Sequence, residues 1–133
     1  MDSIHVSLIA VVMTIVGVVV SYRLIFGKEK LARGEKPRGS HELEVAIKMG
    51  SASEKSEAMR EMARLYAQHG DAWTAESYMK LALNVLEEEN GTLSPELVPT
   101  LKDYAQLLRK FSRIGQADEM DKRIRNVQKQ RSD

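Results

Sequence analysis

The chain has 133 residues, a formal net charge of +1 and no cysteine. This length leaves room for one small domain beside any membrane segment. The near-zero charge argues against a general nucleic-acid-binding protein, and the lack of cysteine excludes a disulfide framework and a thiolate metal site.

The N-terminal segment is strongly apolar. From Ile4 to Tyr22 the only ionisable group before the final tyrosine is His5, and the apolar character extends to Phe26. Nineteen helical residues span ~28 Å, close to the hydrocarbon thickness of a bilayer. We expect residues 1–26 to form a retained transmembrane anchor. A cleaved signal peptide would begin with basic residues and end in a cleavage signal, and neither is present.

Small and hydroxylated residues in this segment recur every three or four positions, which places them on one side of a helix. Close packing of helices in lipid relies on such side chains. The segment therefore predicts a packing face for another transmembrane helix, made of Ser7, Ala10, Thr14, Gly17 and Ser21.

Basic residues follow the anchor directly, in a linker at residues 27–39. Positive charge resists translocation, so the N-terminus is expected outside and the remaining chain on the cytoplasmic or equivalent side. The sequence does not indicate which membrane this is, organellar (for example mitochondrial) or bacterial inner. The basic residues are Arg23, near the end of the anchor, and Lys28, Lys30, Arg33, Lys36 and Arg38 in the linker.

The remaining chain shows helical periodicity throughout. A short capping helix is expected at residues 40–50, with Ser40 as its N-cap, and Ser51 and Glu54 form a capping-box pattern for the next helix. That helix should end near His69, and a further one should span residues 72–89 before Asn90-Gly91.

Two more helices are expected after this stop. Ser94-Pro95 predicts a helix start, but Pro99 predicts an irregular first turn or a helix that begins near Pro99. This helix should end near Arg113, and the last should span residues 116–130. No segment alternates like a strand, so the predicted fold class is all-α.

Residues 51–133 contain an internal repeat, at about 54–90 and 95–131. Matching residues are 42 positions apart, as in Ala63 with Ala105 and Ala75 with Ala117. Paired helices at such a period are typical of a helical solenoid. Met62-Ala63, Tyr66, Gly70, Ala75, Met79 and Ala82 have the spacing of a tetratricopeptide repeat, and the chain resembles the kinesin-light-chain variety. The second repeat departs from the pattern at Ser112, Asp121 and Ile124.

The resemblance implies a short α-solenoid of two helical hairpins with a packed core. Two repeats are fewer than usually stand alone, so we expect the last helix or a partner to cover the open end. Trp73 is expected either to pack between helices or to anchor a contact. The expected repeat core is Ala63, Tyr66, Ala75, Tyr78, Met79, Ala82, Ala105, Leu108 and Ala117.

The resemblance also implies a protein-binding groove lined by the first helix of each repeat. Most of its charged residues are basic, which favours an acidic partner segment, although an ordinary solvated face has the same composition. The first hairpin is acidic and the second basic, so the basic end is expected to face an acidic partner or anionic lipid. The candidate groove residues are Glu57, Arg60, Arg64, Gln68, Lys102, Gln106 and Arg109.

Nothing in the sequence predicts catalysis. The histidines His5, His41 and His69 are scattered, and no phosphate-binding glycine loop or nucleophile elbow occurs. We expect a membrane-anchored scaffold or adaptor that is not an enzyme and binds no cofactor, metal, nucleic acid or small-molecule substrate. Its expected partners are subunits of a membrane protein complex, which it serves as a non-catalytic subunit or assembly factor, and membrane lipid. The alternative is a receptor for targeting peptides at a membrane surface.

Overall fold

The computed structural model of the protein describes residues 35–132. This part of the chain contains five α-helices and one 3-10 helix, without a strand, so the all-α fold class is confirmed for it. The elements are α2 (Ser40–Met49), α3 (Ala52–Gln68), α4 (Ala72–Asn90), η1 (Pro95–Leu97), α5 (Val98–Lys110) and α6 (Ile114–Ser132).

The predicted transmembrane anchor lies outside the described residues. Its packing face at Ser7, Ala10, Thr14, Gly17 and Ser21 lies outside them as well. Within residues 35–132, no helix combines the length and the apolar character needed to cross a bilayer.

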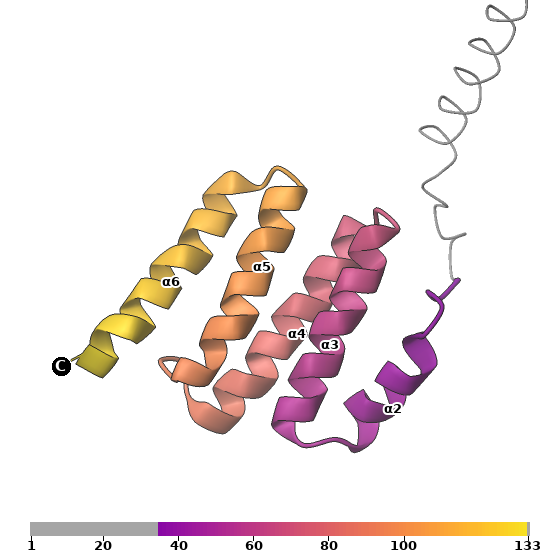
Figure 1. The fold of residues 1–133 in the computed structure, drawn as a ribbon, viewed down its shortest axis with the longest axis horizontal. Coiled ribbons are helices and arrows are strands. Elements are labelled where there is room, and N and C mark those ends of the chain that lie inside the picture. The colour runs from indigo at the N-terminus through magenta and orange to yellow at the C-terminus, as the bar shows by residue number, and fades with distance from the viewer. Residues whose placement is uncertain (1–34, 133) are drawn as a thin grey trace, which may run out of the picture. The chain divides into compact units, whose positions relative to one another are not determined.

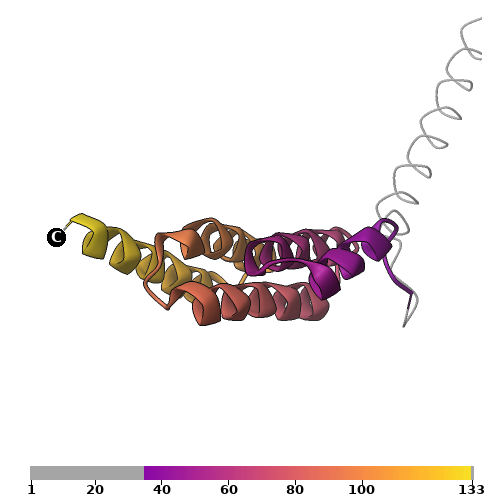
Figure 2. The same cartoon turned by 90° about the horizontal axis from the view of Figure 1, so that it is seen from below.

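The described helices form two antiparallel hairpins. α3 and α4 make the first hairpin and α5 and α6 the second, while α2 packs against α3 (Figure 1). Figure 2 shows α3 and α5 in one layer, with α4 and the N-terminal part of α6 in the other. We call the end with the α3–α4 and α5–α6 turns the turn end, and the end with Gly50 and Gly91 the loop end.

The two turns have the same hydrogen bonds at a shift of 42 residues. In the first, the N–H groups of Gly70 and Asp71 donate to the carbonyls of Ala67 and Tyr66, at 3.2 and 3.0 Å. The second turn repeats both bonds, from Ser112 to Arg109 at 3.0 Å and from Arg113 to Leu108 at 2.8 Å. This Schellman arrangement needs a left-handed residue after the helix. Gly70 has φ 80° and Ser112 has φ 60°, so the serine adopts the conformation of the glycine it replaces.

Most predicted helix boundaries agree with the structure. The capping box at Ser51 and Glu54 is present, and Gly91, with φ 86°, ends α4. The irregular start predicted from Pro99 is confirmed, because η1 precedes α5 and Pro99 lies in the first turn of α5.

Three boundary predictions were wrong. Gly39, not Ser40, occupies the N-cap of α2, and Ser40 is a buried first helical residue. α5 ends at Lys110 instead of near Arg113, because the turn at Ser112 closes earlier. α6 begins at Ile114 directly after it.

The expected repeat core lies inside the two hairpins. Tyr66 and Tyr78 are half-buried and stack on each other with ring centroids 5.7 Å apart. The other members are at most 2% exposed, namely Ala63, Ala75, Met79, Ala82, Ala105, Leu108 and Ala117. Ile124 and Val127 of α6 also point inward, whereas the remaining α6 surface is mainly polar. The last helix therefore covers the open end of the second hairpin itself.

A buried carboxylate joins the hairpins. Glu76 of α4 is 8% exposed, and it accepts a hydrogen bond from the Tyr104 hydroxyl of α5 at 3.2 Å. It also pairs with Arg113 of the second turn and with Lys80 of its own helix. Arg123 of α6 pairs with Glu87 of α4, farther along the same interface. A buried carboxylate is stable only when such donors satisfy it.

The two turn residues give a matched test of backbone strain. Ser112→Gly should raise the free energy of unfolding by about 0.5–1 kcal/mol, because glycine removes the cost of the left-handed conformation. Gly70→Ser should lower it by about 1 kcal/mol. An added Cβ at Gly70 meets no atom within 4 Å, so only the backbone changes. Urea unfolding of the full chain in detergent measures both. If Ser112→Gly instead lowers the free energy of unfolding, the left-handed conformation of Ser112 does not strain the backbone.

Alkaline pH should weaken the Tyr104–Glu76 contact. Burial, and then the neighbouring Glu76 carboxylate, raises the pKa of Tyr104 well above its ordinary value. The unfolded phenol ionises near pH 10, so this stability is complete below about pH 10 and is lost as the pH rises toward the folded pKa. The urea midpoint of Tyr104→Phe should therefore fall less steeply between about pH 9 and about pH 11 than that of the wild type. If the urea midpoints of the wild type and of Tyr104→Phe fall equally with pH, ionisation of Tyr104 does not contribute to the loss of stability.

Candidate functional site

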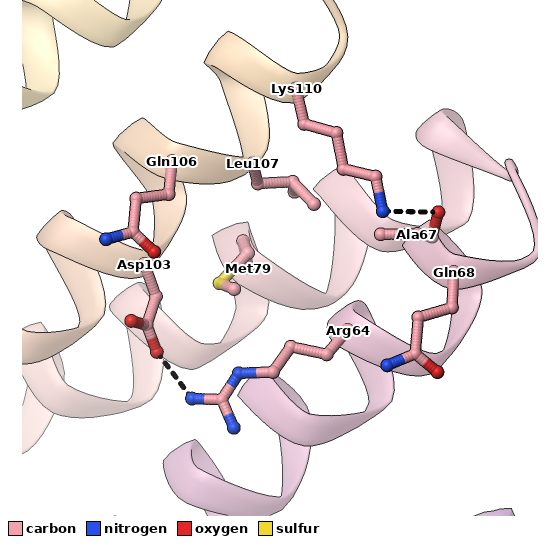
Figure 3. Close-up of a pocket in the computed structure, with 8 residues that line it drawn as sticks. All are labelled: Arg64, Ala67, Gln68, Met79, Asp103, Gln106, Leu107 and Lys110. Carbon is pink, nitrogen blue, oxygen red and sulfur yellow. Dashed lines mark hydrogen bonds and ion pairs between the residues drawn. The ribbon is translucent and has the colours of Figure 1, made fainter.

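The side chains of α3 and α5 that face each other line the candidate site. They surround two hollows, one near the turn end and one near the loop end. The turn-end hollow has a volume of about 220 Å³. It is lined by Arg64, Ala67, Gln68, Met79, Asp103, Gln106, Leu107 and Lys110 (Figure 3).

The turn-end hollow combines an apolar floor with a polar rim. Met79 and Leu107 are buried in the core and provide the floor. Gln68 and Gln106 are exposed and stand on opposite sides, one on α3 and one on α5 (Figure 3). Lys110 closes the turn side, because its ammonium group donates to the Ala67 carbonyl at 3.1 Å. Such a hollow fits an apolar side chain flanked by hydrogen-bonding groups.

An acidic residue separates the two hollows. The Asp103 carboxylate of α5 accepts from Arg60 Nε at 2.8 Å and Nη2 at 2.6 Å, and from Arg64 at 2.9 Å. Arg64 also pairs with Glu61 on its own helix, at 2.5 Å. Arg60 and Arg64 of the predicted basic groove are therefore matched by carboxylates of the domain itself.

The loop-end hollow is more acidic and has a volume of about 410 Å³. Glu57 and Glu96 line it together with Arg60. Two more lining residues, Ser56 and Thr100, are 2% and 0% exposed, and their hydroxyls have no hydrogen-bond partner within residues 35–132. The groove is thus cationic at Lys110 and anionic at Glu57 and Glu96.

The structure brings together most, but not all, of the predicted groove residues. Arg64, Gln68 and Gln106 line the turn-end hollow, and Glu57 and Arg60 line the loop-end hollow. Lys102 is exposed on α5 and lines neither hollow. Arg109 does not line the turn-end hollow and instead pairs with Asp121 of α6.

The sequence interpretation missed Asp103 and Lys110. The internal repeat would have found Lys110, because it corresponds to the candidate Gln68 at a shift of 42 residues, whereas Asp103 corresponds to Glu61, which was not a candidate. By the same shift Arg109 corresponds to the buried Ala67, a position that faces the neighbouring helix.

Trp73 does not pack between helices, so that alternative was wrong. It is 77% exposed at the second position of α4. His69 is half-buried and occupies the C-cap of α3, as expected for a residue at a helix end. No group of three or more histidine, aspartate or glutamate residues within the described range could hold a metal ion. Comparisons with protein-family models, with curated proteins and with solved structures found no match to this chain.

The two arginines that share Asp103 should differ in their contribution to stability. Arg60 donates two hydrogen bonds and its side chain is 20% exposed, whereas Arg64 donates one and is 49% exposed. We expect Arg60→Gln to cost about 1–2 kcal/mol. Arg64→Gln should cost less than about 0.5 kcal/mol because of solvent screening. Urea midpoints of the two variants test this difference, and equal shifts would contradict it.

Proposed function

We propose that this protein is a membrane-anchored adaptor with tetratricopeptide-like repeats, a non-catalytic subunit or assembly factor of a membrane protein complex. Residues 4–26 hold it in the membrane, with the repeat domain on the cytoplasmic or equivalent side. The groove between α3 and α5 binds a segment of a partner protein. The observation that carries the proposal is the turn-end hollow, where an apolar floor at Met79 and Leu107 lies between Gln68 and Gln106.

The charges of the groove favour a partner segment that is acidic at one end and basic at the other. Asp103 and Glu61 offset Arg64 and Arg60, which leaves Lys110 at one end and Glu57 and Glu96 at the other. An extended segment with an acidic residue toward Lys110 and a basic residue toward Glu57 complements this pattern. This charge pattern replaces the mostly basic groove expected from the sequence.

A substitution that fills the turn-end hollow should remove the partner. Gln106→Trp places a large ring over Met79 and Leu107, and it should lower partner binding at least tenfold, equivalent to ~1.4 kcal/mol. Gln128→Trp is the matched control, because Gln128 is exposed on α6 and lines neither hollow. The measurement is purification of the full chain in mild detergent with quantitative mass spectrometry. If both variants retain the same partners, the groove is not the binding site.

The anchor requires a separate variant. Ala10→Leu together with Gly17→Leu should release subunits bound through the transmembrane packing face while leaving groove partners in place. If the double variant retains every subunit, the anchor only tethers the protein. Stable, stoichiometric co-purification supports an adaptor, whereas transient binding of many unrelated peptides supports the alternative of a targeting-peptide receptor.

A further inference from the structure

Two large apolar side chains are exposed at the turn end of the domain. Trp73 is 77% exposed at the start of α4, and Ile114 is 54% exposed at the start of α6. Each directly follows a Schellman turn, so the two positions lie on the same end of the two hairpins. Neither side chain contributes to the core or to the hollows of the groove.

Charge differs between the two ends of the domain. The turn-end segments 35–38, 69–73 and 109–116 contain Lys36, Arg38, Arg109, Lys110 and Arg113 against Glu35 and Asp71. Asp71 is occupied as the N-cap of α4, where its carboxylate accepts from Thr74. The loop-end segments 51–57 and 87–97 contain Glu54, Glu57, Glu87, Glu88, Glu89 and Glu96 against Lys55. Lys48, in the last turn of α2, and Lys129 and Arg131, in the last turn of α6, offset only part of this acidity.

The described chain begins on the side of the turn end. Figure 1 shows α2 running from there toward the loop end. Burial raises the pKa of Tyr66, and the nearby Lys36 ammonium group opposes this, which places Lys36 close to the last turn of α3. Eight residues, 27–34, separate Phe26 from Glu35. A chain of that length reaches at most ~30 Å.

We propose that the turn end docks on an anionic membrane surface. Trp73 and Ile114 enter the headgroup region, and the exposed Arg38 lies near the lipid phosphates, while Arg109 and Arg113 keep their pairs with Asp121 and Glu76. Tryptophan favours this interface because its ring is apolar and its N–H is polar. Basic residues are attracted to an anionic surface, whereas the acidic loop end is repelled by it. The proposal rests on the membrane anchor of the proposed function, and it orients the groove sideways along the membrane.

The single tryptophan of the chain reports on this contact directly. The full chain is reconstituted in nanodiscs of phosphatidylcholine, with or without phosphatidylserine, and Trp73 emission is recorded. With phosphatidylserine we expect a blue-shifted emission that lipids brominated high on the acyl chain quench and that acrylamide quenches weakly. Without phosphatidylserine, or in high salt, lipid quenching should fall at least twofold because the electrostatic attraction is lost or screened.

Two variants test whether the apolar residues of the turn end make the contact. Ile114→Ser should reduce lipid quenching of Trp73, because it removes the second apolar contact. Leu93→Ser is the control, since Leu93 is 48% exposed at the loop end and should leave the quenching unchanged.

Three other outcomes would overturn the proposal in different ways. A water-exposed emission in nanodiscs that contain the chain would refute docking and leave the anchor intact. A blue shift without lipid quenching would show that protein, such as a second copy, covers Trp73. A chain that fails to enter the nanodiscs would refute the anchor and the docking together.

Discussion

The groove depends on the contact between the two hairpins. The buried Glu76 of the first hairpin meets the buried Tyr104 and the partly exposed Arg113 of the second. An isolated buried carboxylate would be unstable, but here each neighbouring group donates a hydrogen bond or a positive charge. The equivalent residue of the second repeat, Asp118, is exposed on α6. The same repeat position thus serves as a junction in one hairpin and as a solvated surface in the other.

Many charged side chains that the sequence suggested for partner binding form ion pairs within the domain. Asp103 takes both Arg60 and Arg64, Arg123 pairs with Glu87, and Arg113 pairs with Glu76. Two of these pairs, Arg113 with Glu76 and Arg123 with Glu87, join an acid of the first hairpin to a base of the second, which accounts for part of the charge asymmetry seen in the sequence. Most of these pairs are partly exposed, so they specify how the hairpins dock more than they add stability.

Much of the fold was predictable because short-range rules determine it. The capping box at Ser51, the stop at Gly91 and the irregular start near Pro99 each follow from local backbone chemistry. The 42-residue repeat also predicted which positions match, and Ser112 shows that the turn is kept even without glycine.

The groove was harder to predict, because helical periodicity shows which side chains share one face of a helix but not which residues of other helices they contact. Arg109 and Lys110 are neighbours in sequence, yet one contacts α6 and the other closes the hollow on α3. That Asp103 neutralises two arginines depends on how α3 and α5 pack, which no single-helix pattern encodes. Trp73 was misplaced for a similar reason, since a large apolar residue usually predicts burial and this one lies at the exposed start of α4.

The two hairpins form one cooperative unit, so that the groove exists only while both are folded. Native-state hydrogen exchange of the full chain in nanodiscs measures this cooperativity. We expect the slowest amides of α3 and α5 to exchange with the same free energy and the same dependence on denaturant. If the amides of α5 and α6 instead exchange through a separate opening of lower free energy while α3 and α4 stay protected, the hairpins fold independently.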